Sequence, residues 1–139
     1  TKDSFAFQQV GFPDSKTAAA ALTRGDYVEF TVTPKPGTSV SITSLTFVPY
    51  WQTIEQATPG AGIAFSIAGG PFIVTTQTGD PNRPSPLTAT FSGVPALQNV
   101  TGPVTFRLLQ PNLGDSSFAG LGRNPGDDIV VLGSVASVP

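Results

Sequence analysis

The stretch Tyr27–Thr33 reads YVEFTVT and alternates residue by residue between two kinds of side chain. Val28, Phe30 and Val32 share one side of an extended chain, and the other four residues share the opposite side. This two-residue period is typical of a β-strand with one face buried and one face in water. The turn residues Pro34–Gly37, PKPG, follow directly and end the strand. The stretch therefore predicts a fold built from strands.

The next apolar stretch along the chain changes phase in its middle. Val40 and Ile42 fall in one phase of the two-residue period, whereas Leu45 and Phe47 fall in the other. One extra residue between the two pairs, at Thr43-Ser44, would bring all four side chains to the same face. The pattern therefore predicts a β-bulge at this point.

Several of the remaining apolar segments alternate in the same way, and the segments are separated by Gly and Pro. No crossover helix stands between them, which favours antiparallel strands in two packed sheets. We therefore predict an all-β fold, a two-sheet antiparallel β-sandwich of jelly-roll type, with an immunoglobulin-like topology as the alternative. No break in composition divides the chain, so residues 1–139 are expected to form a single domain. Further strands are predicted at Ser4–Gln9, Ser39–Val48, Gly62–Ala68, Phe72–Gln77, Leu87–Ser92, Val104–Gln110 and Asp128–Ala136, and helical turns at Ser15–Thr23 and Val94–Asn99.

Charge is sparse along the whole chain. Seven Lys and Arg stand against nine Asp and Glu among 139 residues, and they are scattered singly. Such a chain cannot neutralise several phosphates with one basic stripe, so no nucleic-acid partner is expected. No apolar run approaches the roughly 20 residues that span a bilayer, so no membrane span is expected in the mature chain. Low charge with abundant Gly, Pro, Ser and Thr is typical of exported bacterial surface proteins, and we expect that a targeting peptide has been removed ahead of Thr1.

Catalytic groups are few. The chain contains neither His nor Cys, so the usual general base, the thiolate nucleophile and soft metal ligands are missing. A glycosidase needs only two carboxylates across a cleft. However, adjacent acids such as Asp127 and Asp128 would point to opposite sides of an extended chain. We therefore predict that the protein is not an enzyme, with a glycan hydrolase or lyase as the outlying alternative.

Oxygen-rich turns are the places suited to a metal ion. Hard cations such as Ca²⁺ take carboxylate and amide oxygens as ligands. None of these turns matches the loop of an EF-hand, and the same residue types are ordinary in solvated turns. We expect no cofactor, and a Ca²⁺ bound in these turns would have a structural role. The candidate ligands are Asp80, Asn82, Asn124, Asp127 and Asp128.

Tyr50 and Trp51 stand together at the end of a predicted strand. At least one of two adjacent rings must leave the core of a sandwich, and both side chains carry polar atoms. One hypothesis is a binding site for a polar ligand such as a glycan, with Gln52 and Arg83 as hydrogen-bonding partners. The alternative is that Trp51 closes the end of the sandwich and donates its indole N–H to a loop carbonyl.

Two segments resemble exported bacterial proteins of the PEP-CTERM group. Gly25–Phe47, GDYVEFTVTPKPGTSVSITSLTF, is similar to a pattern common in that group, Y-x-x-F-T-x-T-P-x-x-G-x-x-x-x-x-x-S-L-x-F. Val94–Leu108, VPALQNVTGPVTFRL, is similar to a later segment in which a short loop leads into a strand carrying an Arg. Gly133–Pro139, GSVASVP, stops where the group's Val-Pro-Glu-Pro sorting signal would begin. The group usually continues after its Ser-Leu-x-Phe strand with Arg- and Ser-rich sequence, whereas this chain has Val48–Gln52, VPYWQ.

The resemblance implies export from a Gram-negative-type cell and a place at the cell surface or in the extracellular matrix of a biofilm, and it implies no ligand. Our main hypothesis is a structural subunit that self-associates, into fibres where a terminal strand is added to a neighbour's sheet. The first predicted strand is the candidate for this pairing, within its own domain or with a neighbour. The alternative is a carbohydrate-binding module that recognises exopolysaccharide through exposed aromatic residues. The assembly residues are Ser4, Phe5, Ala6, Phe7, Gln8 and Gln9.

Overall fold

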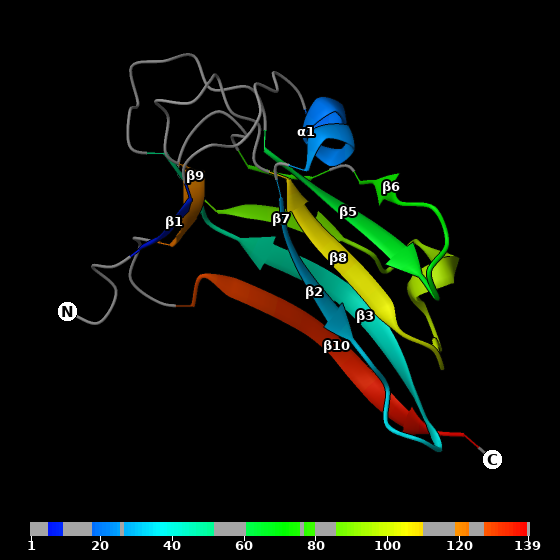
Figure 1. Ribbon diagram of the computed structural model, residues 1–139. Helices are drawn as coiled ribbons and strands as arrows, with labels where there is room; N and C mark the ends of the chain where they lie inside the picture. Colours follow the sequence, from blue (N-terminus) through cyan, green and yellow to red (C-terminus); the bar gives the residue numbers. More distant parts are fainter. Residues whose placement is uncertain are drawn as a thin grey trace.

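The computed structural model describes residues 6–9, 18–25, 27–51, 61–75, 77–79, 86–109, 119–122 and 127–138, and the structural statements below concern these residues. Their backbone is mostly antiparallel β-strand with almost no helix (Figure 1). The elements in chain order are β1 (Ala6–Gln9), α1 (Ala18–Arg24), β2 (Tyr27–Val32), β3 (Thr38–Phe47), β4 (Pro49–Trp51), β5 (Gly62–Ile67), β6 (Ile73–Val74), β7 (Leu87–Thr90), the 3₁₀ helix η2 (Pro95–Leu97), β8 (Val104–Leu109), β9 (Ala119–Gly122) and β10 (Ile129–Ser137).

Two main sheets pack against each other. One has the strand order β2-β8-β5-β6 and the other the order β10-β3-β7, and every pairing within them is antiparallel. The predicted all-β, two-sheet antiparallel sandwich is therefore confirmed, and the choice between jelly-roll and immunoglobulin-like topology stays a prediction. A short third sheet, β1-β9-β4, continues beyond the end of β3, since one residue separates β3 from β4. The strands β4 and β9 are not among those predicted from the sequence.

The predicted bulge lies in β3. Leu132 of β10 is opposite Ser44, and the next residue, Gly133, is opposite Ile42, so Thr43 is the extra residue. Thr43 is exposed, while the apolar side chains on both sides of it reach the core. The bulge therefore reconciles the two phases of the sequence pattern.

The core between the main sheets is formed by apolar side chains from both of them. Phe106 is fully buried near its centre, with its ring centroid 5.5 Å from that of Phe30 and 5.9 Å from that of Phe91. Because these rings come from β2, from β8 and from the residue that follows β7, they join the two sheets. The largest buried side chains of this core are Ile42, Leu45, Phe47, Ile63, Phe65, Leu87, Leu97, Phe91, Val104, Phe106 and Leu108.

A smaller apolar cluster lies on the other face of the β2-β8-β5-β6 sheet. There Ala64 of β5 and Leu109 of β8 are buried together with Ala21 of α1. The helix predicted from the alanine run is thus confirmed, and it ends at Gly25, whose N–H bonds to the carbonyl of Ala21 at 2.9 Å with a φ of 93°. Neither helix in the described part of the chain is long and apolar enough to cross a membrane.

The strand predicted over Phe72–Gln77 is much shorter than expected, because the chain crosses there between sheets. Only Ile73 and Val74 form a strand with β5, and the N–H of Thr75 adds one further bond, to the carbonyl of Ile63. Thr78, a few residues later, instead forms a two-way backbone bridge with Thr88 of β7, in the opposite sheet. A segment that changes sheet cannot remain one continuous strand.

Candidate functional site

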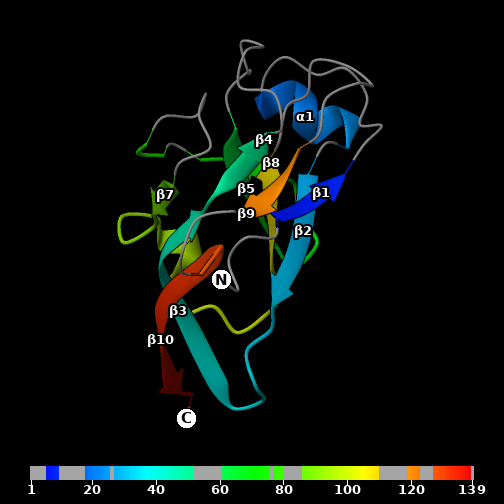
Figure 2. The ribbon, with the colours of Figure 1, turned by 90° about the vertical axis from the view of Figure 1, so that its left-hand side faces the viewer.

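The most distinctive surface feature is the free border of β10. This strand is nine residues long and reads IVVLGSVAS, without a charged residue or a proline. Among the described strands, only β3 pairs with it, and β10 forms the border of its sheet (Figures 1 and 2). Border strands of natural sheets usually carry charges, prolines or a covering segment that prevents pairing with another chain. The strand β10 carries neither charges nor prolines.

Two backbone hydrogen bonds set the direction in which the polar groups of β10 point. The N–H of Val48 bonds to the carbonyl of Asp128 at 3.1 Å, and the N–H of Val138 bonds to the carbonyl of Gly37 at 2.9 Å. In an antiparallel pair, residues alternate between those that bond to the partner strand and those that point away from it. Even-numbered residues of β10 therefore bond to β3. The N–H and C=O groups that point to the open side belong to Ile129, Val131, Gly133, Val135 and Ser137.

The partner strand supports the same assignment independently. Val135 lies opposite Val40. Both backbone groups of Val40 point away from β10. The N–H of Val40 bonds to the carbonyl of Val100 at 2.9 Å, and the carbonyl of Val40 accepts from the N–H of Val100 at 2.8 Å. Val135 therefore cannot bond to Val40, and its own N–H and C=O face the open border.

The bulge keeps this alternation intact along β10, because the extra residue belongs to β3. Gly133 is the residue of β10 that lies beside the bulge. A Cβ placed on Gly133 would collide with the carbonyl oxygen of Ser41. Glycine therefore allows the close approach of the two backbones at this point.

An apolar groove runs along the inner side of the β10 border. It has a volume of about 500 Å³ and lies between β10 and the end of β2. Val40 and Ile42 of β3 contribute to its lining, and Lys35 is the one charged residue among the described residues that line it. Val135 lines the groove and is 70% exposed, and Leu132 is 56% exposed. Part of the apolar surface of this border is thus left in water.

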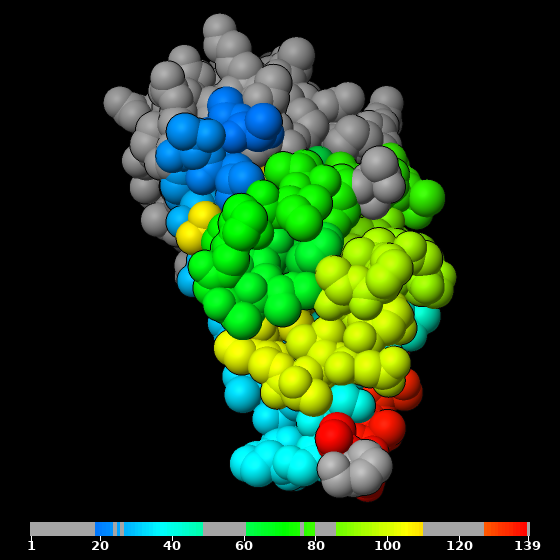
Figure 3. Space-filling model, turned by 90° about the vertical axis from the view of Figure 1, so that its right-hand side faces the viewer, coloured from blue at the N-terminus to red at the C-terminus, as the bar shows by residue number. Residues whose placement is uncertain are grey.

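The opposite border of the sandwich is covered to a greater extent. Figure 3 faces that side and shows the β5–β6 hairpin lying against the segment that contains η2. The hollow between them is smaller, about 240 Å³, and is lined by residues such as Phe65, Ile73 and Pro95. On this opposite border Thr78 also bridges the free side of β7, whereas no described strand pairs with the free side of β10.

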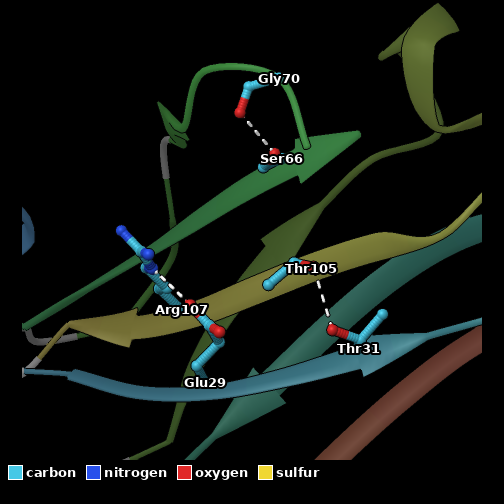
Figure 4. Close-up of polar contacts among 6 residues, drawn as sticks. All are labelled: Glu29, Thr31, Ser66, Gly70, Thr105 and Arg107. Carbon is cyan, nitrogen blue, oxygen red and sulfur yellow. Dashed lines mark hydrogen bonds and ion pairs between the residues drawn. The ribbon is translucent and has the colours of Figure 1, made fainter. Parts of the chain in front are cut away.

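A second cluster lies on the outer face of the β2-β8-β5-β6 sheet. The guanidinium of Arg107 lies between two rings, 4.2 Å from the ring centroid of Tyr27 and 3.7 Å from that of Phe72. Its Nε also donates to a carboxylate oxygen of Glu29 at 2.7 Å (Figure 4). The side chain of Arg107 is 22% exposed and that of Glu29 43% exposed. These contacts connect β2, β8 and the residue that precedes β6.

Only part of the predicted ligand site falls in the described residues. The backbones of Tyr50 and Trp51 lie in β4, opposite Gly120 and Ala119 of β9. Gln52 and Arg83 lie outside the described residues, so the glycan site stays a prediction.

The predicted assembly strand is paired within the chain. Residues 6 to 9, that is Ala6, Phe7, Gln8 and Gln9, form β1 and pair with Ala119–Gly122 of β9. Ser4 and Phe5 lie outside the described residues. The first strand is therefore engaged in cis, and β10 presents the longer free border.

The predicted metal ligands are described only in part. Asp80, Asn82 and Asn124 lie outside the described residues. Asp127 is exposed, and the backbone carbonyl of Asp128 is engaged by Val48. Within the described ranges, no three acidic side chains gather in a way that would hold a metal ion.

Sequence reasoning predicted the strand Asp128–Ala136 but assigned it no role. A signal was present, since nine consecutive residues without charge or proline are unusual for a border strand. However, the pattern does not tell whether such a strand lies at the border or in the middle of a sheet. Comparisons of the chain with protein-family models, with curated proteins and with solved structures find no match.

Proposed function

We propose that this chain is a non-catalytic structural subunit of an exported cell surface or extracellular matrix, and that subunits associate by strand addition at the free border of β10. The observation that carries the proposal is an uncharged border of nine residues, with five residues whose backbone groups point outward. Strand addition needs such a row of unpaired groups and gains affinity from main-chain hydrogen bonds.

The energetics favour pairing at this border. A hydrogen bond formed between two chains contributes about 0.5–1.5 kcal/mol, and a row of them adds up along the strand. Burial of the exposed side chains of Leu132 and Val135 adds an apolar contribution. No charged side chain of β10 has to be desolvated. These contributions oppose the loss of translational and rotational freedom on association.

The proposed location rests on the sequence. Low charge, abundant Gly, Ser and Thr, and the resemblance to the PEP-CTERM group support export to a surface or matrix of a Gram-negative-type cell. The proposal places the assembly border on β10 rather than on Ser4–Gln9, because β10 is a border strand of nine residues, whereas the described part of the first strand, residues 6–9, has four.

Light scattering after size-exclusion chromatography, over a series of protein concentrations, tests the proposal. The wild-type chain should associate as concentration rises, and Val135→Lys should remain monomeric because a charged side chain would have to be buried at the border. Ser92→Lys adds the same charge at an exposed turn in another part of the molecule and should behave as wild type.

A wild-type chain that stays monomeric at all concentrations would overturn the proposal. The carbohydrate-binding alternative would then come first. Its measurement is retention on immobilised polysaccharides, compared between the wild type and Trp51→Ala.

A further inference from the structure

We propose that the strand added at this border is β10 of a second copy, antiparallel to the first and related to it by a two-fold axis at Gly133. The inference rests on the proposed function and specifies its partner and register. Both sheets would then join into one sheet of order β7-β3-β10-β10-β3-β7.

The backbone groups of β10 match those of a second β10 in this register. An antiparallel pair exchanges two hydrogen bonds between residues that both point toward each other. The outward residues are spaced evenly about Gly133, so Ile129 meets Ser137, Val131 meets Val135, and Gly133 meets itself. Each outward residue thus finds an outward partner, and about ten hydrogen bonds form along the border.

Charge favours β10 over the other border strands as a partner for itself. Asp127 and Asp128, the nearest acids in the sequence, precede the strand and would lie at opposite ends of the paired border. The border strand β2 carries Glu29. The remaining border strands of the main sheets are shorter, with four residues in β7 and two in β6, and β7 is already bridged on its free side by Thr78. Only β10 offers a long, neutral and free border among the described strands.

The side chains are also compatible with this register. Val135, which is 70% exposed in one chain, would lie beside Val131 of the second copy on the inner face. Leu132, 56% exposed, would lie opposite Ser134 on the outer face. The pairing therefore covers the two apolar side chains of β10 that are most exposed.

The symmetry limits what this border can build. A two-fold interface uses the same surface on both copies and closes after two subunits. Pairing through β10 therefore produces a dimer, and growth into fibres requires a second, different interface on each dimer.

Disulfide cross-linking tests the register. Because the natural chain contains no cysteine, only the introduced cysteines can form a disulfide. In the proposed register, residue 132 of one chain lies opposite residue 134 of the other, in a non-hydrogen-bonded pair with about 4.5 Å between Cα atoms. This spacing lies within the range that a disulfide bridges. The two copies of residue 132 would lie diagonally across the pair, with roughly 7–8 Å between their Cα atoms, which is beyond that range.

The experiment uses Leu132→Cys and Ser134→Cys, each alone and mixed in equal amounts under mild oxidation. We expect disulfide-linked dimers in the mixture and little cross-linking in either variant alone. A mixture of Leu132→Cys with Ser92→Cys is the control and should remain uncross-linked. Light scattering of each variant serves to check that the substitution leaves association unchanged from the wild type.

Two results would overturn the inference, and they differ from failure of the proposed function. Strong cross-linking of Leu132→Cys with itself would place the axis elsewhere along β10. Association by light scattering without any cross-link at residues 132 and 134 would show that another register or another border is used. A wild-type chain that does not associate would instead remove the proposed function together with this inference.

Discussion

Gly133 lies so close to Ser41 of the neighbouring strand that a side chain on Gly133 would meet the backbone carbonyl of Ser41. The close approach occurs beside the bulge, where β3 holds one residue more than β10. A backbone carbonyl cannot rotate away as the end of a flexible side chain can, so both strands would have to shift to accept a Cβ on Gly133. The position of β10 beside the bulge in β3 therefore depends on a glycine at residue 133.

Replacement of Gly133 by alanine should destabilise the fold. The Cβ would force the two backbones apart, and such overpacking typically costs about 1–3 kcal/mol. Urea unfolding, followed by tryptophan fluorescence at dilutions where the chain is monomeric, measures this loss. Ser134→Ala, on the same strand with an exposed side chain, is the control and should change the stability little. Equal stability of the two variants would show that β10 can move away from β3 freely.

Deletion of Thr43 should be much more damaging than its substitution. Without the extra residue, Ile42 and its partner in phase, Val40, would turn away from the face shared by Leu45 and Phe47. Loss of one fully buried apolar side chain costs about 1.5–3 kcal/mol, so the deletion should cost about 3 kcal/mol or more. Thr43→Ser keeps the length of β3 and should have nearly wild-type stability in the same unfolding measurement.

Proline should destabilise the fold at Ala136 of β10 but should leave folding intact at the neighbouring Val135. The N–H of Val135 points to the open border, so Val135→Pro removes no hydrogen bond within the chain. The N–H of Ala136 points to β3, and Ala136→Pro should lower the free energy of unfolding by about 2 kcal/mol or more. Only Val135→Pro should fold normally and yet fail to associate. If Val135→Pro is as unstable as Ala136→Pro, the assigned direction of the backbone groups is wrong.

The planar side chain of Arg107 should matter more than its charge alone. Arg107→Lys keeps the positive charge but loses the stacking between Tyr27 and Phe72. We expect a loss of about 0.5–1 kcal/mol for stacking at a partly exposed site. Glu29→Gln removes the ion pair, which is worth about 0–1 kcal/mol and weakens with salt. A double-mutant cycle at low and high salt separates the two contributions. A loss that disappears entirely in high salt would contradict a role for stacking.

The strands themselves were predictable because their signal is local. In Tyr27–Thr33 the inward set Val28, Phe30 and Val32 follows from a two-residue period, and all three pack against the core. The phase change around Thr43 predicted the bulge for the same reason. Short pieces such as β4 and β9 have too few residues to show a period, which is why they were not predicted.

The candidate site was predicted only as a strand. The apolar, β-branched residues of Asp128–Ala136 indicate a strand but do not show which neighbours it has. Nothing in the sequence therefore favoured this strand over Ser4–Gln9 as the assembly strand, and residues 6–9 of that segment pair with β9 on one side. The stacking of Arg107 with Phe72 was likewise beyond reach, because it depends on the pairing of β5 with both β6 and β8.

By itself, the sequence determined the longer strands of the main sheets, the inward side chains of β2 and the place where β3 bulges, because these depend on the local pattern of neighbouring residues. Only the tertiary structure decided that β10 lies at a border, that Val135 turns its backbone groups outward and that Gly133 meets Ser41. Strand pairing joins segments far apart in the chain, and its free energy depends on all the partners at once. The order of strands in a sheet, and with it the free border, is therefore a property of the whole fold.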